Sequence, residues 1–154
     1  MRLNLSSQIV LNKVPVEVYR PETAVDHSEI TRCEKIDTVI FPKSDEGACH
    51  IVDQMEIEIK ARQRDGKYCV LGLGTGLSLT PVFQELIRRY DEGKLSFRNV
   101  VVFNAYEYFP LTSTTKNSSI SQLRKRLLDH IDIPEQNIFT FDGTIEQDKV
   151  QESC

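Results

Sequence analysis

The sequence predicts an α/β fold with a three-layer, mostly parallel sheet flanked by helices. Two observations support this prediction. Residues 68–83 pass from an apolar run through a glycine loop into helical periodicity, which is the order strand, loop, helix. One helix later, residues 100–103 form a second apolar run that is rich in β-branched side chains. Strand, helix and strand in this order form the βαβ unit from which parallel sheets are built.

Helices are expected where apolar residues return at helical spacing. The first is expected over residues 45–64, and its apolar stripe consists of Ala48, Ile51, Val52, Met55 and Ile59. The second is expected over residues 80–91, with Pro81 just inside its start and Gly93 just past its end. That placement of proline and glycine is the usual asymmetry of helix termini. The third is expected over residues 117–130, with the stripe Ile120, Leu123, Leu127 and Ile131.

Three strands are expected, over residues 68–73, 99–104 and 137–141. Because residues 100–103 show no polar alternation, we expect the middle strand to be covered on both faces. A right-handed crossover between the first two strands places their carboxyl ends side by side at one edge of the sheet. Residues 1–40 show no sustained period and are expected to form an extension packed on the core. Residues 41–154 are expected to form the domain itself.

Composition favours one soluble domain that handles small molecules. A length of 154 residues fits a single domain, and 40% hydrophobic residues supply its core. The net charge of −4 argues against a nucleic-acid surface. No stretch approaches the ~20 apolar residues of a membrane span, and no signal peptide is recognised, so a cytoplasmic location is expected. The four cysteines and three histidines show no ligand spacing, so no metal site is expected.

Candidate ligand-binding residues follow the first two strands, because open α/β sheets bind ligands outside the carboxyl ends of their strands. In the first loop, a helix start aims unpaired amides and the positive end of its dipole at one point, which suits a phosphate. The candidate phosphate-binding residues are Gly74, Thr75, Gly76, Leu77 and Ser78. The second loop, residues 104–108, supplies polar side chains. From the residues alone, a tight packing turn and an ordinary polar strand end remain equal alternatives.

Two nucleotide-binding interpretations of the glycine loop fit poorly. As a dinucleotide fingerprint, Gly72-x-Gly74-x-x-Leu77 lacks the third glycine. As a methyltransferase loop, the sequence has Gly72 in place of the acidic residue and Ser78 in place of the last glycine. Methyltransferase activity therefore stays a third and weaker hypothesis.

Several sequence blocks, taken in order, resemble one enzyme family. They are Leu71-Gly-Leu-Gly-Thr-Gly-Leu-Ser-Leu79, Leu95-Ser-Phe-Arg-Asn-Val-Val-Val-Phe-Asn104, Glu107-Tyr108, Leu128-Asp-His-Ile-Asp-Ile-Pro134 and Asn137-Ile138. These blocks resemble the glucosamine-6-phosphate deaminase/isomerase family, a relative of 6-phosphogluconolactonase, from about residue 40 to the end. The resemblance implies a Rossmann-like sheet that is incomplete relative to the full family domain, because this chain matches only its amino-terminal part.

The resemblance also implies a reaction and a ligand. The reaction is aldose–ketose isomerisation with loss of ammonia, from glucosamine 6-phosphate to fructose 6-phosphate, with no metal or organic cofactor. The implied partner is a small sugar phosphate held by Thr75, Gly76 and Ser78, and homo-oligomer formation is left open. A carboxylate of the family's D-E-Y segment moves a proton between C1 and C2. Tyr106 stands at the family's aspartate position, and Glu107 is the acid that remains.

Three departures from the family pattern favour further hypotheses. The phenol of Tyr106, with a reference pKa of about 10, is about six units from an aspartate and supplies little base at neutral pH. Leu77 and Leu79 replace a small or hydroxyl residue and a proline. Nothing in residues 142–154 resembles the family's ring-opening histidine segment. We therefore expect the amino-terminal part of a longer protein, inactive alone; the alternatives are a catalytically silent sugar-phosphate sensor and, with less support, a 6-phosphogluconolactonase-like hydrolase.

Overall fold

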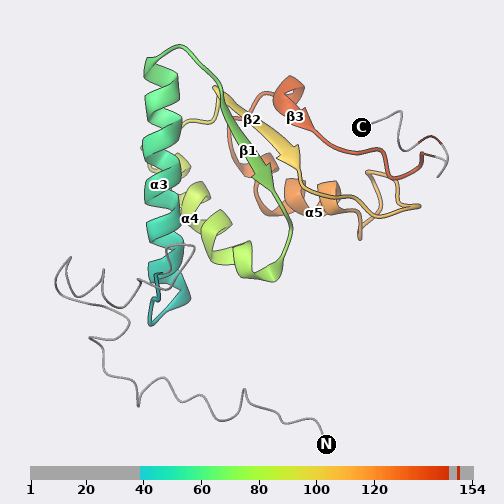
Figure 1. Cartoon of the computed structure of the whole chain (residues 1–154), viewed down its shortest axis with the longest axis horizontal. Helices are drawn as coiled ribbons and strands as arrows, with labels where there is room; N and C mark the ends of the chain where they lie inside the picture. The colour runs from blue at the N-terminus through green and yellow to red at the C-terminus, as the bar shows by residue number, and fades with distance from the viewer. Residues whose placement is uncertain (1–38, 146–148, 150–154) are drawn as a thin grey trace, which may run out of the picture. The chain divides into compact units, whose positions relative to one another are not determined.

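The computed structural model describes residues 39–145 and 149. By its internal contacts the chain divides into Met1–Lys43 and Ser44–Cys154, and the helices and strands described below lie in the second unit. They are α3 (Ser44–Arg64), β1 (Cys69–Leu73), α4 (Thr80–Asp91), β2 (Val100–Asn104), α5 (Ser119–Arg126) and β3 (Ile138–Phe139) (Figure 1). The predicted extension covers residues 1–40, and its residues 1–38 lie outside the described part of the chain, so its packing on the core stays a prediction.

The strands form one parallel sheet in the order β1-β2-β3, which confirms the predicted α/β class. In this register Leu73 at the end of β1 lies opposite Asn104 at the end of β2. The Ala105 amide donates to the Leu73 carbonyl across 2.8 Å, which continues the pairing one residue further. The loops that follow these two strands therefore leave the sheet side by side, as the crossover argument predicted.

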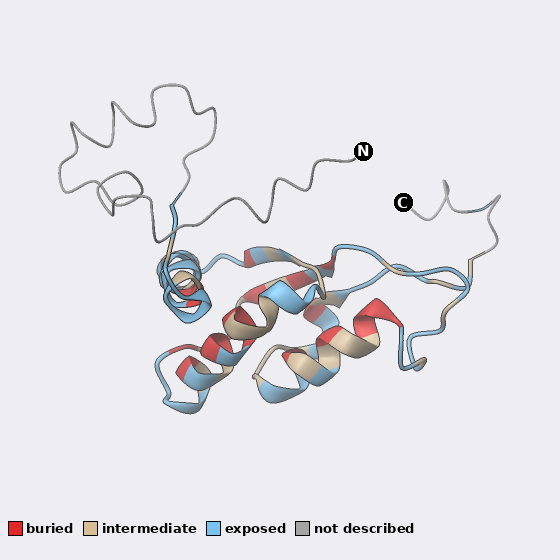
Figure 2. Ribbon diagram, turned by 90° about the horizontal axis from the view of Figure 1, so that it is seen from below, coloured by how far each residue is buried: buried red, intermediate tan, exposed pale blue. Residues whose placement is uncertain are grey.

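Helices α4 and α5 cover one face of the sheet, as the edge-on view shows (Figure 2), and α3 packs beside α4. The core between these elements contains fully buried side chains from every layer, among them Val52, Ile59, Phe83, Leu86, Phe97, Val100, Val102 and Leu123. Burying a side chain of this size contributes roughly 1.5–3 kcal/mol to stability. The apolar stripes predicted for the first and third helices supply part of this core.

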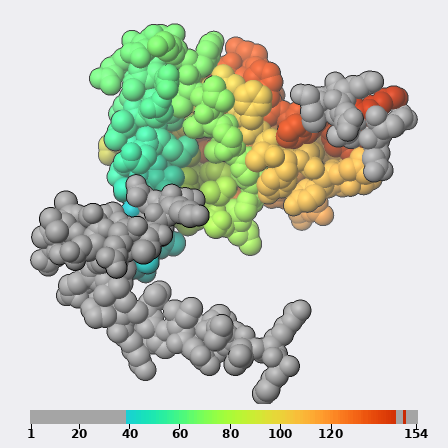
Figure 3. Space-filling model, viewed as in Figure 1, coloured from blue at the N-terminus to red at the C-terminus, as the bar shows by residue number. Residues whose placement is uncertain are grey.

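The opposite face of the sheet is exposed, so the expectation that β2 is covered on both faces is wrong for the described part of the chain. Successive strand residues point to opposite faces, and Val70, Phe103 and Phe139 are 61%, 47% and 47% exposed. The rings of Phe103 and Phe139 stack with centroids 4.9 Å apart. The space-filling view looks onto this open face of the sheet, with β1 and β2 nearer the viewer than α4 and α5 (Figure 3). The described residues thus supply the sheet and a helical layer on one of its faces.

The first two helices follow the sequence signals closely, and the third differs in its bounds. α4 has the predicted bounds, and Gly66 and Gly93 adopt φ values of 66° and 69° after α3 and α4, where glycine is favoured. Among the stripe residues of α3, Ile51 is 47% exposed instead of buried. The third helix is shorter than expected: α5 ends at Arg126, and Leu127 breaks it with φ −145° before a short 3-10 turn.

An ion-pair network joins α3 to α4. Arg89 donates to Glu85 on its own helix at 2.7 Å, and to Asp53 and Glu56 on α3 at 2.6 Å each. Arg88 also donates to Glu85 at 2.7 Å. Although burial opposes ionisation, the Arg88 hydrogen bonds, with help from Arg89, lower the pKa of Glu85 to about 2. The carboxylate of Glu85 is therefore ionised at all pH values well above about 2.

Replacing Glu85 with glutamine is expected to change the acid stability. Because folding depresses the pKa of Glu85 from 4.5 to about 2, its contribution is present above pH 4.5 and is lost as the pH falls toward about 2. Glu85→Gln should lower the melting temperature at neutral pH and make its decrease between those pH values shallower. Asp91→Asn on the same helix is the control. An acid dependence that Glu85→Gln leaves unchanged would contradict this assignment.

Candidate functional site

The loop after β1 presents backbone groups to solvent at the sheet edge. It runs through Gly76, which has φ −57° and ψ 147°, into a 3-10 turn over Leu77–Leu79 that leads directly into α4. No side chain of the described residues caps this turn. Gly76, Leu77 and Ser78 are exposed, and Leu77 is 86% exposed. Exposed amides at a helix start, with a serine hydroxyl among them, are suited to binding an anion.

Tyr106 from the second loop lies directly against this first loop. Its hydroxyl accepts a hydrogen bond from the Thr75 amide at 3.3 Å and shares another with the Thr75 hydroxyl at 2.8 Å. A side-chain carbon added at Gly74 would lie 3.4 Å from the Tyr106 ring, so the ring packs over that glycine. The bonds from the hydroxyl and the amide of Thr75 lower the pKa of the phenol. The structure thus brings together the two loops that the sequence marked as candidates.

A polar network continues from Thr75 into the sheet and into α5. The Thr75 hydroxyl lies 3.3 Å from the Ser119 hydroxyl, which in turn donates to the Asn104 side-chain oxygen at 3.1 Å. The Asn104 amide group donates to the Tyr106 carbonyl at 2.8 Å. Ser119 and Asn104 are buried, at 1% and 2% exposure. These bonds fix the ends of β1 and β2 and the start of α5 relative to one another.

Glu107 holds the amino terminus of α5 with both carboxylate oxygens. One oxygen accepts from the Tyr108 and Ser119 amides, at 2.9 and 2.8 Å, and the other from the Ser118 hydroxyl and the Ile120 amide, at 2.8 and 3.1 Å. Burial alone would raise the pKa of Glu107, but these hydrogen bonds lower it overall. A carboxylate with four donors at a helix amino terminus acts as a capping group.

Arg126, at the end of α5, forms hydrogen bonds with the loop that contains the candidate phosphate-binding residues. Its guanidinium donates to the carbonyls of Thr75 and Gly76, at 2.7 and 3.3 Å, and to the Thr80 hydroxyl at 2.6 Å. It also lies 5.3 Å from the centroid of the Phe83 ring. No sequence pattern marks Arg126 as a site residue, because it is one of three basic residues in the last turn of a helix.

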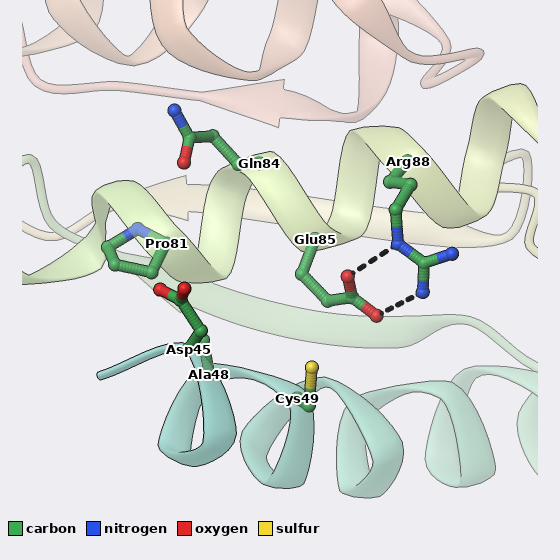
Figure 4. Close-up of a pocket in the computed structure, with 7 residues that line it drawn as sticks. All are labelled: Asp45, Ala48, Cys49, Pro81, Gln84, Glu85 and Arg88. Atoms are coloured by element: carbon green, nitrogen blue, oxygen red, sulfur yellow. Dashed lines mark hydrogen bonds and ion pairs between the residues drawn. The ribbon is translucent and has the colours of Figure 1, made fainter. Parts of the chain in front are cut away.

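A separate hollow lies between α3 and α4 (Figure 4). It is lined by Asp45, Ala48, Cys49, Pro81, Gln84, Glu85 and Arg88. The Glu85 carboxylate in this hollow is turned toward Arg88 and pairs with Arg88 and Arg89 of its own helix, and Arg89 in turn joins α4 to Asp53 and Glu56 of α3. Its charged side chains therefore serve packing, and the edge beside Thr75 is the better candidate for a ligand.

Two further features concern metals and membranes. Within the described residues, no three histidine, cysteine, aspartate or glutamate side chains gather as they would around a metal ion. In the same part of the chain, no helix combines the length and apolar character that a membrane crossing requires.

Comparison with known proteins identifies the relatives of this chain. No family model matches it. Over all 154 residues it is 50% identical to a glucosamine-6-phosphate deaminase-like protein of Bacteroides thetaiotaomicron, whose amino-terminal part it matches. The chain is a relative of the glucosamine-6-phosphate deaminases. It is also 44% identical over 73 residues, 47% of its length, to the glucosamine-6-phosphate deaminase of Corynebacterium glutamicum. With the corresponding enzyme of Porphyromonas gingivalis it shares 42% over 84 residues, 54% of its length.

Solved structures agree with this relationship. A monomeric glucosamine-6-phosphate deaminase of the NagB superfamily matches 73% of the chain, with a TM-score of 0.65 and 27% identity, and the match covers 44% of that protein. The devB protein, at 20% identity, shares the fold over 73% of the chain with a TM-score of 0.58, covering 45% of that protein. This chain spans 23%, 29% and 32% of the three curated relatives named above. The resemblance inferred from sequence and the Rossmann-like class are both confirmed.

Proposed function

We propose that residues 41–154 form the amino-terminal part of a glucosamine-6-phosphate deaminase-like domain, and that residues 74–78 bind the phosphate of the sugar. One observation supports this proposal above the others: the uncapped, exposed turn Leu77–Leu79 lies at the carboxyl end of β1, beside the end of β2. That is where parallel α/β sheets bind phosphorylated ligands. The relatives named glucosamine-6-phosphate deaminases supply the identity of the sugar.

In this proposal the whole protein converts glucosamine 6-phosphate and water into fructose 6-phosphate and ammonia. The aldose becomes a ketose when a proton moves from C2 to C1, and water replaces the amine at C2. The loop would hold the phosphate end of the sugar so that the reacting carbons stay in a fixed position. We also propose a cytoplasmic location, because the buried free thiol of Cys69 suits a reducing compartment.

A catalytically silent sugar-phosphate sensor is the second candidate, and the two side chains at the end of the second loop favour it. Glu107 accepts four hydrogen bonds, so its carboxylate is committed to α5. Tyr106 offers a phenol where a base is needed. Replacing Tyr106 with aspartate in the full-length protein separates the candidates. If the native protein releases no ammonia and the variant does, the native protein is a binding protein. If the native protein releases ammonia and the change abolishes it, Tyr106 serves the reaction.

Binding of the phosphate is tested by thermal protection of the chain. We expect glucosamine 6-phosphate to raise the melting temperature more than glucosamine does, because only the former carries the group that the loop binds. With Ser78→Ala, about three- to ten-fold more glucosamine 6-phosphate should be needed for the same rise in melting temperature, since one hydroxyl donor is lost. Ser113→Ala, at an exposed serine of another loop, is the control. Equal protection by the two sugars would contradict the phosphate loop.

A further inference from the structure

The hydroxyl of Tyr106 forms hydrogen bonds with two polar groups of the loop, the amide and the hydroxyl of Thr75. It lies 3.3 Å from the amide nitrogen of Thr75 and 2.8 Å from its hydroxyl oxygen. A phosphate oxygen bound at Thr75 would accept hydrogen bonds from these same two groups. One acceptor position in the site is therefore already filled by an oxygen atom of the protein itself.

The position of Tyr106 is held by packing as well as by these two bonds. Its ring lies against Gly74, where any larger residue would meet the ring at 3.4 Å. The Tyr108 ring lies edge-on beside it, with centroids 5.6 Å apart. Behind Thr75, the Ser119 hydroxyl at 3.3 Å continues the network into α5. This arrangement stabilises the position in which the phenol covers Thr75.

The same residue is free to leave without opening the core. Tyr106 is 37% exposed, and among the described residues its ring lies outside the buried apolar core. Rotation toward solvent would break the two bonds to Thr75 and expose the amide and hydroxyl to a ligand. A ligand that binds only the open arrangement loses apparent affinity in proportion to the fraction of molecules that are closed.

We propose that Tyr106 competes with the sugar phosphate for the amide and hydroxyl of Thr75, so that the ligand binds only after the phenol has moved away. This inference rests on the proposed function, because it assumes that the loop binds phosphate. It makes Tyr106 a residue that sets the affinity of the site. Tyr106→Phe removes the competing oxygen but keeps the ring over Gly74.

Calorimetric titration of glucosamine 6-phosphate tests the proposal. We expect Tyr106→Phe to bind the sugar phosphate about three- to ten-fold more tightly than the native chain, which is the effect of one or two neutral hydrogen bonds. Tyr68→Phe, the same change at an exposed tyrosine before β1, is the matched control and should leave the affinity unchanged. Inorganic phosphate should show the same order of affinities, since the competition concerns only the phosphate group.

A spectroscopic titration gives a second, independent measurement. Hydrogen bonds from Thr75 lower the pKa of Tyr106, so displacement by phosphate should move the ionisation of one tyrosine to higher pH in ultraviolet difference spectra. Tyr106→Phe should abolish that ligand-dependent change. Tight binding by the native chain with equal or weaker binding by Tyr106→Phe would overturn the competition and leave the phosphate loop standing. Absence of binding by both proteins would overturn the competition and the proposed function together.

Discussion

Replacing Glu107 with glutamine is expected to destabilise the chain by about 2–4 kcal/mol. Both oxygens of this carboxylate accept two hydrogen bonds each, three of the four from backbone amides at and before the start of α5. An amide group keeps one of these oxygens and turns N–H groups toward the remaining donors. Partly buried donors would then lose their acceptor, and the helix would lose the negative charge at its amino terminus. Urea denaturation of the native and variant chains measures the difference.

Glu58→Gln is the control for this change. Glu58 is an exposed carboxylate on α3 that pairs with Arg62, and its loss should cost less than about 0.5 kcal/mol. A Glu107→Gln chain with native stability would show that the carboxylate is not a structural cap. If that variant also lost ammonia release in the full-length protein, Glu107 would instead be a catalytic residue.

Replacing Arg126 with alanine is expected to weaken binding of glucosamine 6-phosphate by about ten-fold or more. The guanidinium holds the carbonyls of Thr75 and Gly76 and the hydroxyl of Thr80, so it fixes the backbone whose amides would meet the phosphate. Without it the loop must be ordered by the ligand, and that ordering costs affinity. The lost hydrogen bonds and the contact with Phe83 should also lower stability by about 1–2 kcal/mol.

Two variants define the role of Arg126 more closely. Arg126→Lys keeps the charge but cannot form the same fork of hydrogen bonds, so we expect it to recover only part of the affinity. Lys125→Ala removes a neighbouring exposed cation from the same helix and should leave the affinity nearly unchanged. Affinity that falls equally in Lys125→Ala and Arg126→Ala would indicate a general charge effect and contradict the supporting contacts.

The sequence predicted the sheet and its helices because their signals are local. Apolar periodicity, proline inside a helix start and glycine after a helix end fixed α4 to the residue. The expected meeting of the two loops followed from the chirality of the crossover, and the register of Leu73 with Asn104 agrees with it. The exposure of Phe103 could not be predicted, because an apolar strand looks the same in sequence whether one face or both are covered.

The candidate site was predicted in its location but not in its contacts. Thr75 and Tyr106 were named separately, yet nothing in the sequence indicates that a phenol bonds to a loop 31 residues away. Arg126 reaches Thr75 across 51 residues, and its position in a basic helix end resembles many solvent-exposed arginines. The capping role of Glu107 is also not visible in the sequence, because its partners lie far along the chain. Apart from the adjacent Tyr108, they begin 11 residues later at Ser118. Such contacts depend on how the elements pack, which local patterns do not encode.

The most direct test of the phosphate site is a nuclear magnetic resonance titration of the isotope-labelled chain with glucosamine 6-phosphate. The proposed site predicts that the backbone amide signals of Thr75, Gly76 and Ser78 shift most, with that of Tyr106 moving as the phenol leaves. Glucosamine without phosphate should leave these signals in place. Shifts confined to the hollow between α3 and α4, or no shifts at saturating sugar phosphate, would contradict a phosphate site at the carboxyl ends of β1 and β2.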